Sequence, residues 1–300
     1  MDPLPPPFVA VAGLANVRDI GGWPVLDGTG AAAGAVRRGL VYRGPDPSTA
    51  TAAGLATLRE LGVGVFVDLR SAPQVARAGG TSGTPPPGFR RVWAPVFADA
   101  LYTPARAAAR YRMYASDGVD GIVQAFAEIL TQGAPAFARV LRLLAATPPA
   151  ALVHCTTGNN RSGAFVAVLL ALLGVPPRAV AAEYALSQAG LAAARPAAVA
   201  RLVQNPVFEG QRARVERMLG AREESMLAML ELVRERWGGA EGYVRRCCGL
   251  AADEVEAVRR VLVASEPPSF GEVFTEIAEE GTCLAPDDSP VAKQTLESTQ

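Results

Sequence analysis

The stretch from Ala151 to Leu173, ALVHCTTGNNRSGAFVAVLLALL, constrains the fold of this chain more than any other. It opens with a short apolar run that is typical of a buried strand, and a polar loop follows from Cys155 to Arg161. From Ser162 an apolar segment of helical length continues without a proline until Pro176. A strand that leads through a tight loop into a helix N-terminus predicts an anion site. Successive backbone N–H groups point inward there, and the helix end adds partial positive charge.

The residues of this loop indicate the chemistry. Cys155 places a thiol at the base of the loop, and Arg161 places a guanidinium on its rim. A thiolate can attack phosphorus, and a helix N-terminus with nearby cations lowers a cysteine pKa from about 8.5 into the range of about 3.5–7.5. Arg161 can hold two phosphate oxygens, Gly158 permits the turn, and Ser162 can donate a hydrogen bond to the departing thiolate. We therefore predict nucleophilic catalysis by Cys155.

The spacing of Cys155 and Arg161 indicates a catalytic loop only together with the residues and elements around it. Of the four cysteines, only Cys155 has an arginine six positions later; a strand precedes it and a helix follows. His154, directly before it, is the single histidine of the chain, which excludes Ser-His-Asp hydrolases, Cys-His proteases and multi-His metal sites. We expect His154 to support the loop and the thiol pKa without acting as a base. We expect neither a metal nor another cofactor.

The segment HCTTGNNRSG resembles the active-site signature of Cys-dependent protein-tyrosine and dual-specificity phosphatases. The whole chain resembles, more narrowly, an atypical bacterial and fungal tyrosine phosphatase family whose members also hydrolyse phosphoinositides. Four further stretches carry this resemblance: Asn16–Gly22, Val36–Arg43, Val67–Ser71 and Tyr243–Arg245.

The resemblance implies an α/β fold, with a central, mainly parallel sheet flanked by helices and further helices on the C-terminal side. It implies hydrolysis of phosphomonoesters, foremost phosphotyrosine, through a phosphocysteine intermediate. The substrate would be a phosphorylated protein or a small phosphomonoester. The phosphate would be bound by loop residues, namely Thr156, Thr157, Gly158, Asn159, Asn160 and Arg161.

The loop departs from the family pattern at two positions. Relatives usually carry Lys-Asp before the arginine, where this chain has Asn159 and Asn160. In relatives the aspartate has been assigned as the general acid, and the lysine is tied to phosphoinositide recognition. An asparagine amide can hydrogen-bond a phosphate, but it cannot give a proton to a leaving oxygen. The general acid therefore has to be sought elsewhere in the chain.

We select Asp68 as the candidate acid, or as a residue that orients Arg161. The β-branched run 63–69 is typical of a buried parallel strand, and parallel strands deliver their last residues to the ligand-binding edge of an open sheet. The alternative is a structural carboxylate that caps a loop or pairs with Arg70. Loop aspartates provide further candidates, namely Asp99, Asp117 and Asp120.

We expect one phosphatase domain over residues 8–265, between flexible tails at 1–7 and 266–300. Residues 178–242 are expected to form a helical excursion, either a lid over the site or a pair of plain surface helices. Helices are also predicted over 121–130 and 134–146 by their apolar spacing.

The segment Asn16–Gly22 lies near the active site in relatives, and its neighbours Arg18 and Asp19 could form a buried ion pair.

Bulk properties exclude several classes of function. The formal net charge is zero, which argues against an electrostatic nucleic-acid binder. The cysteines have neither disulfide-framework nor zinc-site spacing. The N-terminus MDPLPPPF lacks the features of a secretory signal, and the helix after the loop is too short to span a bilayer. We expect a reducing, cytoplasmic setting, which a nucleophilic thiol needs. The oligomeric state stays open.

Three alternatives remain. Asn160 is compatible with a phosphate-binding pseudophosphatase, and a phosphoinositide-directed phosphatase is the second possibility. A sulfur-transfer or arsenate-reducing protein is the third. It is disfavoured because rhodanese-type loops are usually one residue shorter and small arsenate reductases carry their cysteine at the extreme N-terminus.

Overall fold

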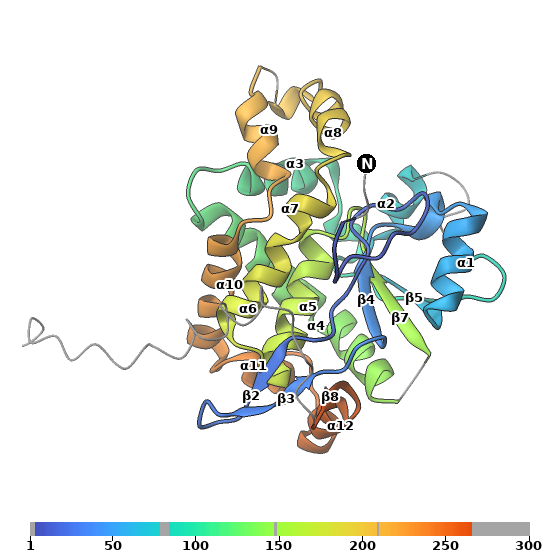
Figure 1. Cartoon of the computed structure of the whole chain (residues 1–300). Helices are drawn as coiled ribbons and strands as arrows, with labels where there is room; N and C mark the ends of the chain where they lie inside the picture. The colour runs from blue at the N-terminus through green and yellow to red at the C-terminus, as the bar shows by residue number, and fades with distance from the viewer. Residues whose placement is uncertain (1–3, 79–83, 147–148, 209, 266–300) are drawn as a thin grey trace, which may run out of the picture.

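The computed structural model describes residues 4–78, 84–146, 149–208 and 210–265 (Figure 1). The expected tail at 266–300 and the first three residues of the N-terminal tail lie outside the described residues.

A five-stranded sheet in the order β1-β4-β7-β5-β6 forms the centre of the fold (Figure 1). Its strands are β1 (Arg18–Asp19), β4 (Val41–Gly44), β5 (Val63–Asp68), β6 (Arg90–Trp93) and β7 (Ala150–His154). The last four run parallel and β1 is antiparallel to β4, so the expected mainly parallel α/β fold is confirmed. β7 lies in the middle of the sheet, and its last residue opens the phosphate-loop sequence at the carboxyl edge.

Helices cover both faces of this sheet. Their bounds are α1 (Ala52–Glu60), α2 (Ala72–Arg77), α3 (Pro104–Tyr114), α4 (Asp120–Ala145), α5 (Asn160–Leu173), α6 (Pro177–Ala185), α7 (Ser187–Gly190), α8 (Arg195–Leu202), α9 (Arg212–Met218), α10 (Glu223–Trp237), α11 (Ala240–Arg246) and α12 (Ala252–Leu262). Three short 3-10 helices are η1 (Pro47–Thr49), η2 (Asp99–Leu101) and η3 (Pro206–Phe208).

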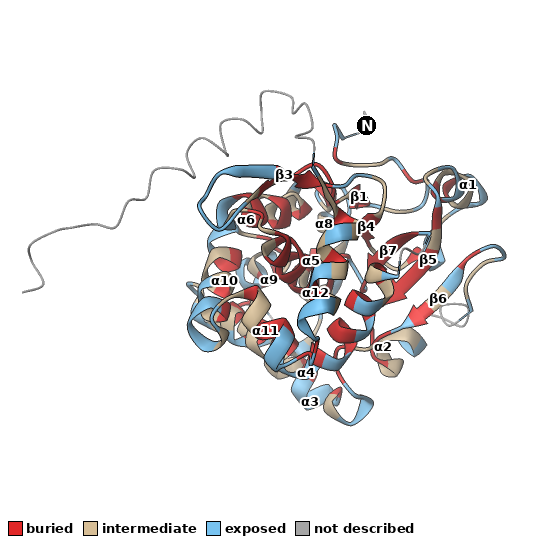
Figure 2. Ribbon diagram, turned by 90° about the horizontal axis from the view of Figure 1, so that it is seen from below, coloured by how far each residue is buried: buried red, intermediate tan, exposed pale blue. Residues whose placement is uncertain are grey.

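The alternation of side chains along β5 divides the core. Val65 and Val67 belong to the large apolar cluster with α4 and α5, whereas Phe66 joins a smaller cluster with Leu58 of α1 on the other face. Figure 2 shows the buried interior of α5 behind α12, with the sheet to one side. Because both faces are covered, the central strands carry continuous apolar runs.

The helices predicted over 121–130 and 134–146 are one continuous helix, the 26-residue α4, with Pro135 inside it. A proline inside a helix removes one backbone hydrogen bond and costs about 3 kcal/mol. Both halves of α4 nevertheless bury apolar side chains on the same face, such as Phe126 before the proline and Phe137 after it. Each buried side chain of this kind contributes roughly 1.5–3 kcal/mol, so tertiary packing outweighs the local break.

A small antiparallel sheet joins the two ends of the domain. It consists of β2 (Pro24–Leu26), β3 (Ala32–Val36) and β8 (Val263–Ala264). At Gly34 the backbone has φ 143°, and a Cβ there would lie 2.1 Å from the carbonyl oxygen of Ala264. A glycine is therefore needed for this close approach.

The region 178–242 does not form one excursion. α6 and α10 pack against each other, and α10 also contacts α4 and α5, so both belong to the core layer. Among the described residues of this region, α8, η3 and α9 project, and α8 and α9 stand at the top of Figure 1 above α3. α7 does not project, because its Ser187 and Gly190 are buried. A separate apolar cluster joins this projecting part to α3, with Phe208 and Val215 packed against Ala115 and Tyr111. No helix in the described ranges is long and apolar enough to cross a membrane.

Arg18 and Asp19 do not pair with each other. The Arg18 guanidinium donates to Glu183, and the Asp19 carboxylate accepts hydrogen bonds from the backbone N–H groups of Gly21 and Gly39. Successive residues in a strand point to opposite faces, so neighbours in β1 cannot readily meet.

Candidate active site

The loop between β7 and α5 is the segment for which the sequence predicts an anion site. Cys155 follows the last residue of β7 and is 2% exposed, while α5 begins at Asn160. Gly158 has φ 73°, and a Cβ at this position would lie 2.6 Å from the carbonyl carbon and oxygen of Gly44. The loop thus lies directly against the end of β4, and only glycine satisfies both its φ and its space.

The thiol of Cys155 lies among groups that favour its ionised form. Its Sγ is 3.6 Å from the Ser162 hydroxyl oxygen. Burial raises the pKa of the Cys155 thiol. The charge of Arg161 and hydrogen bonds from Ser162 and from the Gly158 N–H outweigh this effect and lower the pKa to about 7. Near neutral pH a large fraction of the protein therefore carries a thiolate, as nucleophilic attack on phosphorus requires.

Arg161 lies half-buried on the rim of the loop. Its Nη2 donates to Thr156 Oγ1 over 3.2 Å, and its Nη1 donates to the side-chain oxygen of Gln74 in α2. Sequence reasoning did not single out Gln74. A signal was present, since Ser71-x-x-Gln74 is a capping box that predicts a helix starting here, directly after the end of β5.

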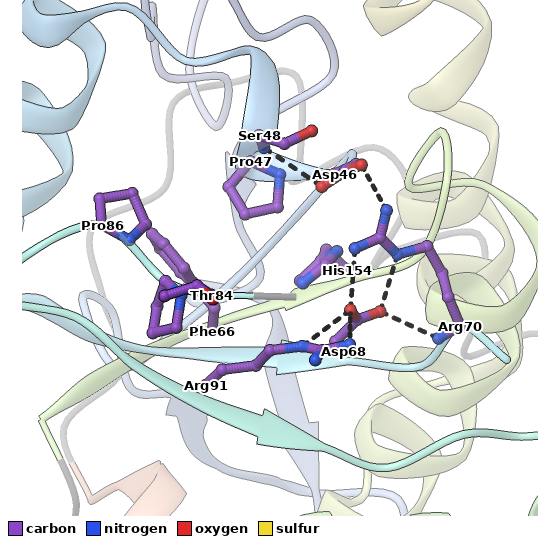
Figure 3. Close-up of a pocket in the computed structure, with 11 residues that line it drawn as sticks. Asp46, Pro47, Ser48, Phe66, Asp68, Arg70, Thr84, Pro86, Arg91 and His154 are labelled. Atoms are coloured by element: carbon purple, nitrogen blue, oxygen red, sulfur yellow. Dashed lines mark hydrogen bonds and ion pairs between the residues drawn. The ribbon is translucent and has the colours of Figure 1, made fainter. Parts of the chain in front are cut away.

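Asp68 lies at the carboxyl end of β5, opposite His154 in β7, as the strand prediction required. Its carboxylate accepts two hydrogen bonds of 2.8 Å from Arg70, at Nε and Nη2, and another of 2.8 Å from Arg91 (Figure 3). Burial raises the pKa of Asp68, but the hydrogen bonds and charge of Arg70 outweigh it and hold that pKa below its usual range.

An ionised carboxylate between two guanidinium groups has no proton to donate. This geometry contradicts the expectation that Asp68 is the general acid and supports the alternative in which it pairs with Arg70. Arg70 also forms an ion pair with Asp46, at the carboxyl end of β4. The resulting cluster ties together the ends of β4 and β5 beside the phosphate loop.

The other candidate aspartates are engaged elsewhere. Asp99 accepts a hydrogen bond of 3.0 Å from the N–H of Ala72, at the start of α2. Asp117 forms an exposed ion pair with Arg217 over 2.7 Å, and Asp120 is the first residue of α4. Within the described ranges, none of the three forms a hydrogen bond or ion pair with the loop.

The two asparagines of the loop are anchored to neighbouring helices. Asn159 is buried and donates from its amide to the carbonyl oxygen of Gly220 over 3.2 Å. The side-chain oxygen of Asn160 accepts a hydrogen bond of 3.2 Å from the Tyr184 hydroxyl of α6. Thr156 and Thr157 are exposed at the front of the loop.

His154 supports the loop from below. Its ring is buried, with Nδ1 3.3 Å from the carbonyl oxygen of Cys155. Burial lowers the pKa of His154, so the ring is neutral and Nδ1 carries the proton that it can donate to this carbonyl. The ring lines a cavity of about 30 Å³ with Asp68, Arg70 and Arg91, seen in Figure 3.

Two tyrosines of α3, Tyr111 and Tyr114, were not selected from the sequence, although the charge of Arg161 acts on both. Burial raises the pKa of Tyr114 to about 12, and the charges of Arg161 and Cys155 both act on its hydroxyl. Arg161 also acts on Tyr111, one turn earlier. The i, i+3 spacing places both tyrosines on one face of α3, where the Tyr111 ring packs against Phe208 with 6.0 Å between the ring centroids.

No group of three or more histidine, cysteine, aspartate or glutamate side chains in the described residues could hold a metal ion.

The amino-acid sequence is similar to those of known phosphatases. The chain is 31% identical over 280 residues to the triple specificity protein phosphatase PtpB of Mycobacterium tuberculosis. The aligned region covers 82% of this chain and 99% of that protein. A tyrosine-protein phosphatase of Nostoc commune is 29% identical over 150 residues, 47% of this chain and 48% of that protein. The model of a family described as the tyrosine phosphatase family matches residues 9–264. The chain therefore belongs to the tyrosine phosphatase family.

Proposed function

We propose that this protein is a Cys-dependent phosphatase that hydrolyses phosphotyrosine through a phosphocysteine intermediate. The observation that carries the proposal is the buried Cys155 thiol, whose pKa is lowered to about 7 by Arg161 and by hydrogen bonds within the loop. A thiolate held among N–H groups at a helix N-terminus is suited to attack a bound phosphate dianion.

In the first step, the Cys155 thiolate attacks phosphorus in line with the ester oxygen. The P–S bond forms as the P–O bond breaks, and the leaving oxygen takes the electron pair. The loop amides and Arg161 receive the phosphate oxygens, whose negative charge they stabilise most in the transition state. For this contact the Arg161 guanidinium would exchange its hydrogen bonds to Gln74 and Thr156 for phosphate oxygens.

In the second step, water attacks the phosphocysteine and the P–S bond breaks, which releases phosphate and returns the thiolate. The Ser162 hydroxyl, 3.6 Å from Sγ, is placed to donate a hydrogen bond to the sulfur as its negative charge develops.

The choice of phosphotyrosine follows from the leaving group. A tyrosine phenol has a pKa of about 10 and leaves as a phenolate far more readily than a serine alkoxide. The loop has Asn160 where relatives carry an acidic residue, and Asp68 is ionised. A site without a carboxylic acid on its loop favours ester oxygens that need little protonation.

The phosphoinositide alternative has less support. The position that carries lysine in relatives is Asn159, and its amide is already bound to Gly220. The site therefore offers one fewer cation to an inositol phosphate.

The projecting helices α8 and α9, with α3, form the cover of the site in this proposal. Cys155 is nearly inaccessible, and the loop residue Asn159 is bonded to Gly220, just after α9. Substrate would reach the loop past the exposed Thr156 and Thr157, and movement of this layer would set the size of the entrance. Rapid alkylation of Cys155 at a rate insensitive to cross-linking of α3 to α9 would contradict a covering role.

The decisive experiment is p-nitrophenyl phosphate hydrolysis by the wild type, Cys155→Ser and Arg161→Ala. We expect turnover by the wild type and its loss in both variants, with a phosphocysteine trapped by acid quench. If the wild type binds tungstate but shows no turnover with this substrate or phosphotyrosine peptides, the protein is a pseudophosphatase.

The physiological substrate is then a phosphotyrosine protein. Because a thiol nucleophile needs a reducing compartment, we place the enzyme in the cytoplasm. We also propose that residues 8–265 form one catalytic domain.

A further inference from the structure

Three successive carbonyl oxygens of the phosphate loop accept hydrogen bonds from side chains that lie outside the loop. The Asn16 amide donates to the carbonyl oxygens of Thr157 and Gly158, over 3.2 and 3.4 Å. Nη2 of Arg43 donates to those of Gly158 and Asn159, over 2.8 and 2.9 Å. Neither donor is on the loop, since Asn16 precedes β1 and Arg43 lies in β4.

These hydrogen bonds to the carbonyl oxygens determine the direction in which the backbone N–H groups of the loop point. In a trans peptide unit the C=O of one residue and the N–H of the next are coplanar and point in opposite directions. Holding the carbonyls of Thr157, Gly158 and Asn159 outward therefore turns the N–H groups that follow each of them inward. The N–H of Gly158 does hydrogen-bond Cys155 and helps to lower its pKa.

Both outer donors depend on one carboxylate, Glu183 of α6. Its Oε1 accepts from Arg18 Nε over 2.8 Å, and its Oε2 accepts from Arg43 Nη1 over 2.5 Å. Arg18 in turn donates from Nη1 to Asn16 Oδ1 over 2.6 Å, which orients the Asn16 amide toward the loop. The β1–β4 register sets Arg18 directly beside Arg43, so that one carboxylate reaches both.

The cluster is entirely buried, with all side chains of the two ion pairs at most 2% exposed. Two guanidinium groups against one carboxylate leave one net positive charge behind the loop. That charge is poorly screened at this depth and favours an anion on the other side. Space for Arg43 comes from Gly163, where a Cβ would lie 2.9 Å from its Nη2.

We propose that Glu183 is a positioning residue for the phosphate site: through Arg43, and through Arg18 and Asn16, it aims the amides of the loop at the thiolate and the phosphate oxygens. The proposal rests on the phosphatase function proposed above and adds a residue that contacts neither the thiol nor the substrate. It also gives a chemical role to Asn16, Arg18 and Arg43. These residues lie in two of the stretches that resemble the family, and the sequence alone assigned them no part in catalysis.

The test compares Glu183→Gln with the wild type in two measurements that need no turnover. One is the pH dependence of Cys155 alkylation by iodoacetamide, followed by mass spectrometry of its peptide, and the other is tungstate binding by calorimetry. The second uncompensated guanidinium left by Glu183→Gln would by itself lower the alkylation pKa and strengthen tungstate binding. We expect the opposite, a rise of the alkylation pKa by about one unit and a fall in tungstate affinity of about tenfold, because the lost amide hydrogen bonds outweigh this extra charge. The matched control is Glu254→Gln, which breaks an exposed ion pair to Arg142 between α12 and α4 and should change neither measurement.

A second variant guards against misfolding of Glu183→Gln. Asn16→Ala removes the hydrogen bonds to the Thr157 and Gly158 carbonyls, together with those between Asn16 and the side chains of Arg18 and Ser187. It leaves both ion pairs and their charges in place, so it should shift both measurements in the same direction by a smaller amount. If the variants lose thermal stability but keep the wild-type alkylation pKa and tungstate affinity, Glu183 is merely structural and the inference is overturned. Absence of wild-type turnover would instead overturn the proposed function, while the two measurements would still decide the role of Glu183.

Discussion

The hydroxyl of Tyr184 donates a hydrogen bond to the side-chain oxygen of Asn160 over 3.2 Å, across the interface between α6 and the start of α5. In relatives this loop position usually carries the aspartate to which general-acid catalysis is assigned. The structure thus has a buried donor already directed at the position, although the residue in it cannot release a proton.

Asn160→Asp should therefore raise activity toward poor leaving groups. An aspartate here would offer a proton to the ester oxygen, and general-acid catalysis is typically worth about 10²–10⁴-fold. We expect kcat for a phosphoserine peptide to rise about tenfold or more, with little change for p-nitrophenyl phosphate, whose leaving group needs little protonation. The measurement is kcat for both substrates at several pH values. Equal changes for the two substrates would show that residue 160 does not reach the leaving group.

Asp68→Asn should destabilise the protein, but it should not show the kinetic effect expected when a general acid is removed. The substitution leaves Arg70 and the partly buried Arg91 without their shared carboxylate, and breaking a buried ion pair costs about 3–5 kcal/mol. Because Arg91 retains some solvent contact, we expect about 3 kcal/mol in urea unfolding. Activities per folded molecule toward alkyl and aryl phosphates should fall by the same factor. A selective loss for alkyl phosphates would restore Asp68 as the acid.

The stability supplied by Asp68 should also depend on pH. Its pKa in the folded protein is below that of the unfolded chain, so its contribution is complete above the unfolded pKa of about 3.9. The contribution is lost as the pH falls through the folded pKa. Acid unfolding of the wild type should therefore be steeper below pH 4 than that of Asp68→Asn, and parallel curves would contradict the ion pairing.

The pH profile of catalysis should report the ionisation of Cys155. With a thiol pKa of about 7, kcat/KM corrected for substrate ionisation should fall about tenfold for each unit below that pH. Arg161→Gln should move the alkylation pKa of Cys155 upward, because the Arg161 charge stabilises the thiolate. An unchanged alkylation pKa in this variant would mean that the guanidinium does not act on the thiol.

Gly158→Ala should abolish activity, and Gly62→Ala is its matched control. Both glycines have φ near 75°, but a Cβ at Gly158 would meet Gly44 at 2.6 Å, whereas nothing lies within 4 Å at Gly62. The left-handed backbone alone costs roughly 1–2 kcal/mol in each variant. Only Gly158→Ala should also displace the loop, which should lower kcat/KM by about 100-fold or more. Similar activities in the two variants would show that the loop tolerates the contact.

The sequence alone led to the strands 63–69 and 151–153 and the helix after Ser162. Buried parallel strands and long apolar helices produce continuous local patterns, so these elements are readable from the chain itself. The loop residues Cys155, Gly158 and Ser162 came with them, because they lie within a few residues of one another. The predicted break between residues 130 and 134 was wrong, because α4 buries apolar side chains on the same face along its whole length and continues through Pro135.

Pairings between distant residues were decided only by the tertiary structure. Whether Asp68 is an acid or an ion-pair partner depends on Arg70 and Arg91, which meet it across the ends of two strands. Arg18 was expected to pair with its neighbour Asp19, yet its partner Glu183 lies 165 positions further along the chain. The residues that do the chemistry are thus written locally around Cys155. The buried ion pairs that position these residues cannot be predicted in the same way. Their partners are far apart in the sequence and meet only because particular strands and helices pack together in the folded protein.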